Sequence, residues 1–153
     1  MVGGANAHVV IDIVGYFTKA ELRKYYLTKQ ADWKPGGEAS TACATGYHMA
    51  SLMEIFDTSN LSYNTSLGET SADSGSGPPA WIWGWIRTGS TSMPDTVEGR
   101  ANCLGWTNST AFEQGTVVRA SSLSWTDPAT AVSPWHASNP VCSNNLASWC
   151  VED

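Results

Sequence analysis

Three kinds of side chain in this sequence could take part in catalysis: histidines, carboxylates and serines that lie among glycines. The histidines are far apart and none forms the His-x-x-x-His spacing of a metal site on a helix: His8, His48 and His136. Ser74 and Ser76 flank a glycine but do not form the Gly-x-Ser-x-Gly turn that presents a nucleophile. The loop aspartates are scattered along the chain: Asp57, Asp73, Asp95 and Asp127. We therefore predict a protein without catalytic activity; a hydrolase with a carboxylate pair such as Asp95 and Glu98 is the alternative.

The four cysteines are spread too widely to hold a metal ion: Cys43, Cys103, Cys142 and Cys150. A zinc site needs tight Cys-x-x-Cys couples, whereas the nearest two cysteines, Cys142 and Cys150, have seven residues between them. An even number of separated cysteines favours two disulfides, with buried free thiols as the alternative. Disulfides persist in oxidising compartments, so we predict a secreted or cell-surface protein without a metal site.

Composition limits the remaining classes of function. A chain of 153 residues suffices for one domain with a core. Only 14% of its residues are charged, the formal net charge is −6, and the lysines and arginines form no run, which excludes a nucleic-acid surface. No stretch approaches the roughly 20 apolar residues that cross a bilayer. The start lacks the charged and apolar segments of a secretory signal, so we expect a mature product or a piece of a longer protein.

The first 38 residues differ from the rest and are interpreted as a linker or docking arm. Residues 7–17 are β-branched and aromatic, which predicts a strand. Their end, residues 12–17, resembles the closing strand of a β-domain found in secreted bacterial proteins. Thr18 could cap a short helix over residues 20–26, and the turn at residues 34–37 closes the arm. The alternative is that the first strand belongs to the main sheet.

From Thr41 onward the pattern predicts short elements separated by long loops. A helix is expected where apolar residues recur at helical spacing: Met49, Leu52, Met53 and Phe56. His48, at the entry to that helix, is expected to make a structural hydrogen bond. Strands are expected at residues 81–87, 117–118, 123–125 and 149–151. Four tryptophans in or near these strands are assigned to the core: Trp81, Trp83, Trp85 and Trp149.

The order of these features resembles the C-type lectin-like domain. In that family a cysteine precedes a Gly-x-x-Leu-Ala-Ser phrase on a helix, a Trp-Ile-Gly strand follows, and three more cysteines end in a closing strand. Residues 46–51, 83–86 and 149–152 are similar to these phrases. The resemblance implies a domain over residues 39–153 with an α+β fold of small mixed sheets, one or two short helices and long loops. It also implies the disulfides Cys43–Cys150 and Cys103–Cys142.

Family members commonly bind sugars through calcium, which needs six to eight oxygen ligands. At the first expected ligand position, Met93-Pro94-Asp95, methionine supplies no oxygen. The second falls on Ala137-Ser138-Asn139, which lacks the usual carboxylate. Glu98 and Asn102 offer replacement oxygens. We therefore expect no cofactor, with calcium kept as an alternative.

The chain has eight tryptophans, and Trp106, Trp125 and Trp135 lie near turn residues, where an exposed indole can stack on a sugar or anchor a partner. Arg87 either stacks on an indole or is a solvated edge residue. The residues expected to contact a ligand are Trp106, Trp135, Asp95, Asn102 and Asn139. We therefore expect an extracellular recognition module that binds a glycan or a protein on a surface. The alternative is a structural subunit or cap of a surface fibre that self-assembles through its N-terminal strand.

Overall fold

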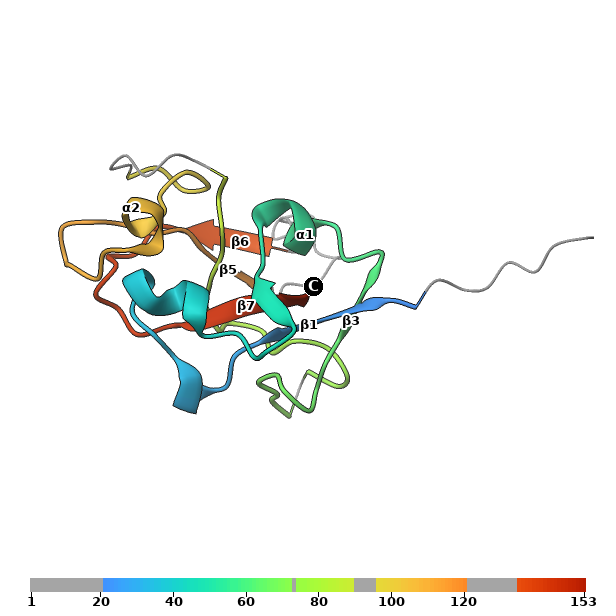
Figure 1. Cartoon of the computed structure of the whole chain (residues 1–153). Coiled ribbons are helices and arrows are strands. Elements are labelled where there is room, and N and C mark those ends of the chain that lie inside the picture. Colours follow the sequence, from blue (N-terminus) through green and yellow to red (C-terminus); the bar gives the residue numbers. More distant parts are fainter. Residues whose placement is uncertain (1–20, 73, 90–95, 121–134) are drawn as a thin grey trace, which may run out of the picture.

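The computed structural model describes residues 21–72, 74–89, 96–120 and 135–153. One curled mixed sheet carries several short helices, which confirms the expected α+β class (Figure 1). The elements in chain order are β1 (Arg23–Leu27), η1 (Gln30–Asp32), η2 (Gly36–Thr41), β2 (Tyr47–Met49), α1 (Leu52–Phe56), β3 (Leu61–Tyr63), β4 (Gly84–Trp85), α2 (Cys103–Trp106), β5 (Val117–Ala120), β6 (Trp135–Ser138) and β7 (Ala147–Glu152). Within the described residues, no helix is long and apolar enough to cross a membrane.

Strand β7 lies at the centre of the sheet, whose order is β3-β1-β7-β4-β5-β6 (Figure 1). One edge of β7 pairs antiparallel with β1. The other edge pairs antiparallel with β2 near the C-terminus and parallel with β4 near the start of the strand. Residues 147–151 are all buried, as expected for a strand that is covered on both faces. The closing strand expected at residues 149–151 is confirmed and extends over Ala147–Glu152.

The helix expected over residues 20–26 is wrong, because β1 occupies most of this segment. Tyr25 and Tyr26 are residues that favour strands, and both are buried. Strand β1 pairs with β3 on one side and with β7 on the other. A helix this short gains little from its own hydrogen bonds, so pairing on both edges determines the structure.

Parts of the segment assigned to the arm contact the described strands that follow it, since β1 pairs with β3 and β7. Besides β1, the turn after Lys34 is fixed: the Gly36 amide donates to the Cys142 carbonyl at 2.8 Å. A Cβ atom on Gly36 would lie 2.2 Å from the Cys103 sulfur, so only glycine allows this close approach. The strand expected at residues 7–17 and the helix cap at Thr18 lie outside the described residues.

Helix α1 begins later than the apolar pattern indicated. Ser51 caps it in a capping box: its hydroxyl accepts from the Glu54 amide, and the Glu54 carboxylate accepts from the Ser51 amide at 2.9 Å. Met49 is buried in β2 and not in the helix. The expected apolar face of the helix is therefore wrong: Ile55 is buried, whereas Met53 and Phe56 are 83% and 51% exposed.

The strand expected at residues 81–87 is shorter, because only β4 is paired as a strand. Gly84 is needed in β4, since a Cβ atom there would lie 2.6 Å from a ring atom of Trp149. Side chains alternate across the sheet: Ile82 and Ile86 pack in one core cluster, and Trp83 and Trp85 pack in the other. The strand expected at residues 117–118 is confirmed as β5, and the one at residues 123–125 lies outside the described residues.

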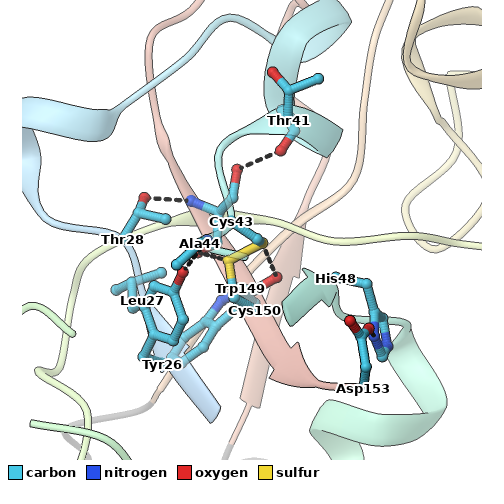
Figure 2. The surroundings of a disulfide bond; sticks show 12 residues. Tyr26, Leu27, Thr28, Thr41, Cys43, Ala44, His48, Trp149, Cys150 and Asp153 are labelled. Carbon is cyan, nitrogen blue, oxygen red and sulfur yellow. Dashed lines mark hydrogen bonds and ion pairs between the residues drawn. A yellow bond between two sulfur atoms is a disulfide. The ribbon is translucent and has the colours of Figure 1, made fainter. Parts of the chain in front are cut away.

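Two disulfides have the pairing implied by the lectin resemblance, Cys43–Cys150 and Cys103–Cys142, and the prediction of bridges over free thiols is confirmed. The first bridge ties the loop before β2 to the central strand β7. Figure 2 shows Tyr26 and Trp149 beside it; the Tyr26 hydroxyl accepts a hydrogen bond from the Ala44 amide at 2.7 Å. The bridge and this hydrogen bond together fasten the loop before β2 to strands β7 and β1.

Candidate functional site

Two tryptophans just before strand β4 and one arginine on strand β5 form a stack. The guanidinium carbon of Arg119 lies 4.3 Å from the ring centroid of Trp81 and 4.5 Å from that of Trp83, which is the geometry of a cation–π contact. Trp81 is 55% exposed, whereas Trp83 and Arg119 are half-buried. The assignment of Trp81 to the core is therefore wrong, and its indole is a large exposed aromatic surface.

Strand register explains why these residues meet. β4 and β5 are antiparallel, with Gly84 opposite Val118, and continuing this register by one residue places Trp83 opposite Arg119. Trp81 has a positive φ of 71°, and the preceding residue, Ala80, makes a parallel bridge with Ala120. The chain thus turns at Trp81, and its indole reaches the same arginine.

Strand β6 extends this surface by one more strand. Arg119 is directly opposite His136, and Val117 is opposite Ser138, so the side chains of β5 and β6 share a face in these pairs. Nε2 of His136 is buried and has no hydrogen-bond partner within the described residues. Buried polar atoms without partners are rare in folded proteins, so this nitrogen is available to a water molecule or a ligand group. We call this surface the Trp–Arg face, and it comprises Trp81, Trp83, Arg119, His136 and Ser138.

A groove of about 250 Å³ adjoins the Trp–Arg face. Its lining is mostly apolar with two polar side chains: Trp83, Val117, Ser138, Pro140, Asn144 and Leu146. Trp83 forms a wall of this groove and also contacts the Arg119 guanidinium. A ligand in the groove would therefore lie next to both an indole and a cation, with a hydroxyl and an amide available for hydrogen bonds.

The charge of Arg119 is not neutralised by a carboxylate of the described residues. The ion pairs given by the structure gather elsewhere, around Glu54 and Asp153. Arg87, expected to stack on an indole or to be solvated, is exposed and lies 3.8 Å from the Glu54 carboxylate. The cation that stacks on the tryptophans is therefore Arg119 and not Arg87.

The second polar cluster has a structural role. His48 contacts Asp153 through Nδ1 at 2.7 Å and Glu54 through Nε2 at 3.1 Å, in line with the structural hydrogen bond expected for it (Figure 2). Burial opposes the charge of Glu54, but hydrogen bonds from Ser51 and His48 outweigh it and lower the pKa of Glu54 from 4.5 to about 2. This carboxylate is engaged in helix capping and strand contacts.

The tryptophans expected to bind a ligand are half-buried and packed. Trp106 contacts the edge of Trp85 with ring centroids 6.0 Å apart. Trp135 contacts Trp149 in the same way at 5.2 Å, on the side of the sheet opposite the Trp–Arg face. Trp125 lies outside the described residues. Each placed indole thus contributes packing area to one of the two core clusters.

The expected polar ligands are also engaged in the fold. Asn102 is 3% exposed and caps α2 by accepting from the Gly105 amide at 3.1 Å. The Asn139 side chain donates to the Gln114 side chain at 2.7 Å and to the carbonyl of Thr96. Asp95 lies outside the described residues, and so does the Met93-Pro94-Asp95 segment as a whole.

The residues considered as replacement calcium ligands are not placed together. Glu98 is exposed on the loop before α2, whereas the side chain of Asn102 points to its own helix cap. The described part of the chain contains no group of three or more histidines, cysteines, aspartates or glutamates that could hold a metal ion.

Sequence reasoning missed most residues of the Trp–Arg face. The aromatic segment at residues 81–85 indicated a buried strand, and it contains no residue type that would predict the turn at Trp81. A usable signal existed at β5: Val117 is buried, so Arg119, two residues later, must lie on the same face and needs a partner there. Comparison of the chain with family models, with curated proteins and with solved structures gave no match, so its function must be argued from this arrangement of residues.

Proposed function

We propose that this chain is a non-catalytic extracellular recognition module with a C-type lectin-like fold, which binds a glycan through the Trp–Arg face. The observation that carries the proposal is the exposed indole of Trp81, which stacks on Arg119 beside a groove walled by Trp83. An indole face offers a flat apolar surface at low entropic cost, and sugar rings present matching C–H surfaces.

The two disulfides support the fold and compartment parts of the proposal. Their pairing is the one implied by the lectin resemblance, and two bridges fit an oxidising compartment. The sugar site is proposed at the Trp–Arg face and not at the calcium positions of the family. This is because the groove offers a serine and an asparagine as polar groups and no carboxylate.

The same residues argue against a hydrolase. Two carboxylates on either side of the bound sugar are the usual requirement for glycoside hydrolysis. The described residues of the Trp–Arg face and of the groove include none, and their polar side chains are an arginine, a histidine, a serine and an asparagine. Such groups hold and orient a ligand through hydrogen bonds, which is the function of a recognition module.

Binding to an immobilised panel of neutral and acidic oligosaccharides tests this function. We expect at least one glycan to bind wild-type protein, and Trp81→Ala to weaken binding about tenfold or more, because the exposed stacking surface is lost. Phe112→Ala is the matched control, since Phe112 is 92% exposed and lies outside the face. Addition of calcium or of a chelator is expected to leave binding unchanged.

Two results would contradict the proposal. If no glycan binds, or if Trp81→Ala and Phe112→Ala have the same effect, the face is not the sugar site. Retention of a protein partner that depends on Trp81 would move the function from glycan to protein recognition.

A further inference from the structure

We infer that the ligand of the Trp–Arg face is an acidic sugar, with its carboxylate on the edge of the Arg119 guanidinium and its ring against Trp83. This inference rests on the proposed function and names the class of glycan. It starts from the way in which Arg119 is held. Within the described part of the chain, the interactions of its guanidinium are two ring contacts, with Trp81 and Trp83.

Stacking occupies the faces of a guanidinium and leaves its edge free. The edge carries five N–H donors in a planar fork, which matches the two oxygens of a carboxylate. In the described residues no acceptor takes a hydrogen bond from Arg119, and its partners are the two indoles. The tryptophans therefore fix the orientation of the fork without using its donors.

The distribution of charge favours an anion at this position. The chain carries a formal net charge of −6, which by itself repels acidic ligands. Arg23 and Arg87 lie near the Glu54 carboxylate, at 3.6 and 3.8 Å, so their charge is balanced locally. Among the described residues Arg119 has no carboxylate partner of this kind, so we infer that its charge is available to a ligand.

The position of Trp83 explains why the acid should be attached directly to a sugar ring. Trp83 touches the guanidinium with its ring and also walls the groove that contains Ser138 and Asn144. A carboxylate on Arg119 and a ring in this groove would thus be neighbours across one indole. A uronic acid has this arrangement, because its carboxylate is a substituent of the pyranose ring.

The experiment compares galacturonic acid trisaccharide with the neutral galactose trisaccharide by calorimetric titration of the whole chain. On wild type we expect the acidic sugar to bind about tenfold more tightly or better, since a charge-assisted bidentate contact is added. In Arg119→Met the preference should fall to about onefold, because methionine keeps apolar contact with the indoles but has no charge. Arg87→Met removes the same charge elsewhere and should keep the preference.

Arg119→Lys is a second variant, which keeps the positive charge but loses the planar fork. Its preference for the acidic over the neutral sugar should therefore drop to a few-fold. Equal binding of the two sugars by wild type, or an unchanged preference in Arg119→Met, overturns the acidic ligand. If the neutral sugar still binds in a Trp81-dependent way, glycan recognition survives that result. If neither sugar binds, the inference fails, and the oligosaccharide panel decides whether the glycan function fails with it.

Discussion

Replacing Glu54 by glutamine should destabilise the protein at neutral pH. In acid the same substitution should have little effect on stability. The Glu54 carboxylate accepts hydrogen bonds from the Ser51 amide at 2.9 Å and the Ser51 hydroxyl at 2.8 Å, and it contacts His48 at 3.1 Å. Arg23 and Arg87 lie within 4 Å of it. Glutamine fits the same capping box, so this substitution removes the charge and little of the shape.

The size of the effect follows from the pKa of Glu54, which falls from 4.5 to about 2 on folding. Burial opposes this shift, and the hydrogen bonds of Ser51 and His48 outweigh it. Each pKa unit corresponds to about 1.4 kcal/mol, which gives an upper bound of about 3.4 kcal/mol. The carboxylate is 24% exposed and its arginine partners are more exposed, so screening reduces the expected loss to about 2 kcal/mol.

The sign of the pH dependence is fixed by the direction of the shift. Because the folded pKa of Glu54 is below the unfolded value, its contribution to stability is fully present above pH 4.5. It is lost as the pH falls from 4.5 towards 2. The free-energy difference between wild type and Glu54→Gln should therefore shrink towards zero in this window.

Urea unfolding followed by tryptophan fluorescence, with the disulfides intact, measures this difference at several pH values. Glu98→Gln is the matched control, because Glu98 is an exposed carboxylate on a loop, and it should change stability by less than about 0.5 kcal/mol. A difference for Glu54→Gln that is independent of pH, or a loss below about 0.5 kcal/mol at neutral pH, would refute the role given to its charge.

Three further changes test the fold around the site. Replacing Cys43 and Cys150 by serine removes a bridge across 107 positions. The loop-closure entropy of such a bridge corresponds to a loss of about 4.8 kcal/mol in the free energy of unfolding, which the urea midpoint measures. Gly36→Ala should cost about 1–3 kcal/mol in the same assay, because its Cβ would lie 2.2 Å from the Cys103 sulfur; unchanged stability would contradict this contact. Trp81→Ala should change the melting temperature little, because the side chain is 55% exposed, so a large drop would assign it to the core.

The disulfide pairing and strands β5 and β7 could be predicted because their signals are local or follow from the order of motifs along the chain. Val117 and Val118 are β-branched neighbours, and the segment around Trp149 is apolar on both faces of its strand. The pairing of Cys43 with Cys150 came from the order of lectin-like phrases. These features need no knowledge of which distant segments meet.

The errors share a cause, because each depends on long-range pairing. The segment before Tyr25 reads as a helix by local pattern, yet it becomes a central strand once β7 and β3 lie on its two edges. Met49 fits a helical stripe, but β2 pairs with β7 and keeps it in a strand. Local propensity is a weak prior that tertiary contacts override.

The Trp–Arg face could not be predicted from the sequence for a related reason. Its residues come from separate segments, and they meet only through the registers of β4 with β5 and of β5 with β6. The backbone turn at Trp81 adds a positive φ that no glycine marks. The one signal in the sequence was Arg119 on a strand that is half-buried. This signal indicates a site only when the residues beside Arg119 in the fold are known.

The separation of this face from the Cys43–Cys150 bridge has a consequence for its function. Cys43–Cys150 holds β7, the strand on which β4 is aligned, while the ligand groups lie on β5, on β6 and in the segment just before β4. Arg119 and His136 lie opposite each other on paired strands, and side chains on strands are held more accurately than side chains on loops, so these polar groups are already ordered before a ligand binds. Substitutions of Trp81 and Arg119 should therefore change binding while leaving the fold intact. This separation allows the proposed function to be tested apart from stability.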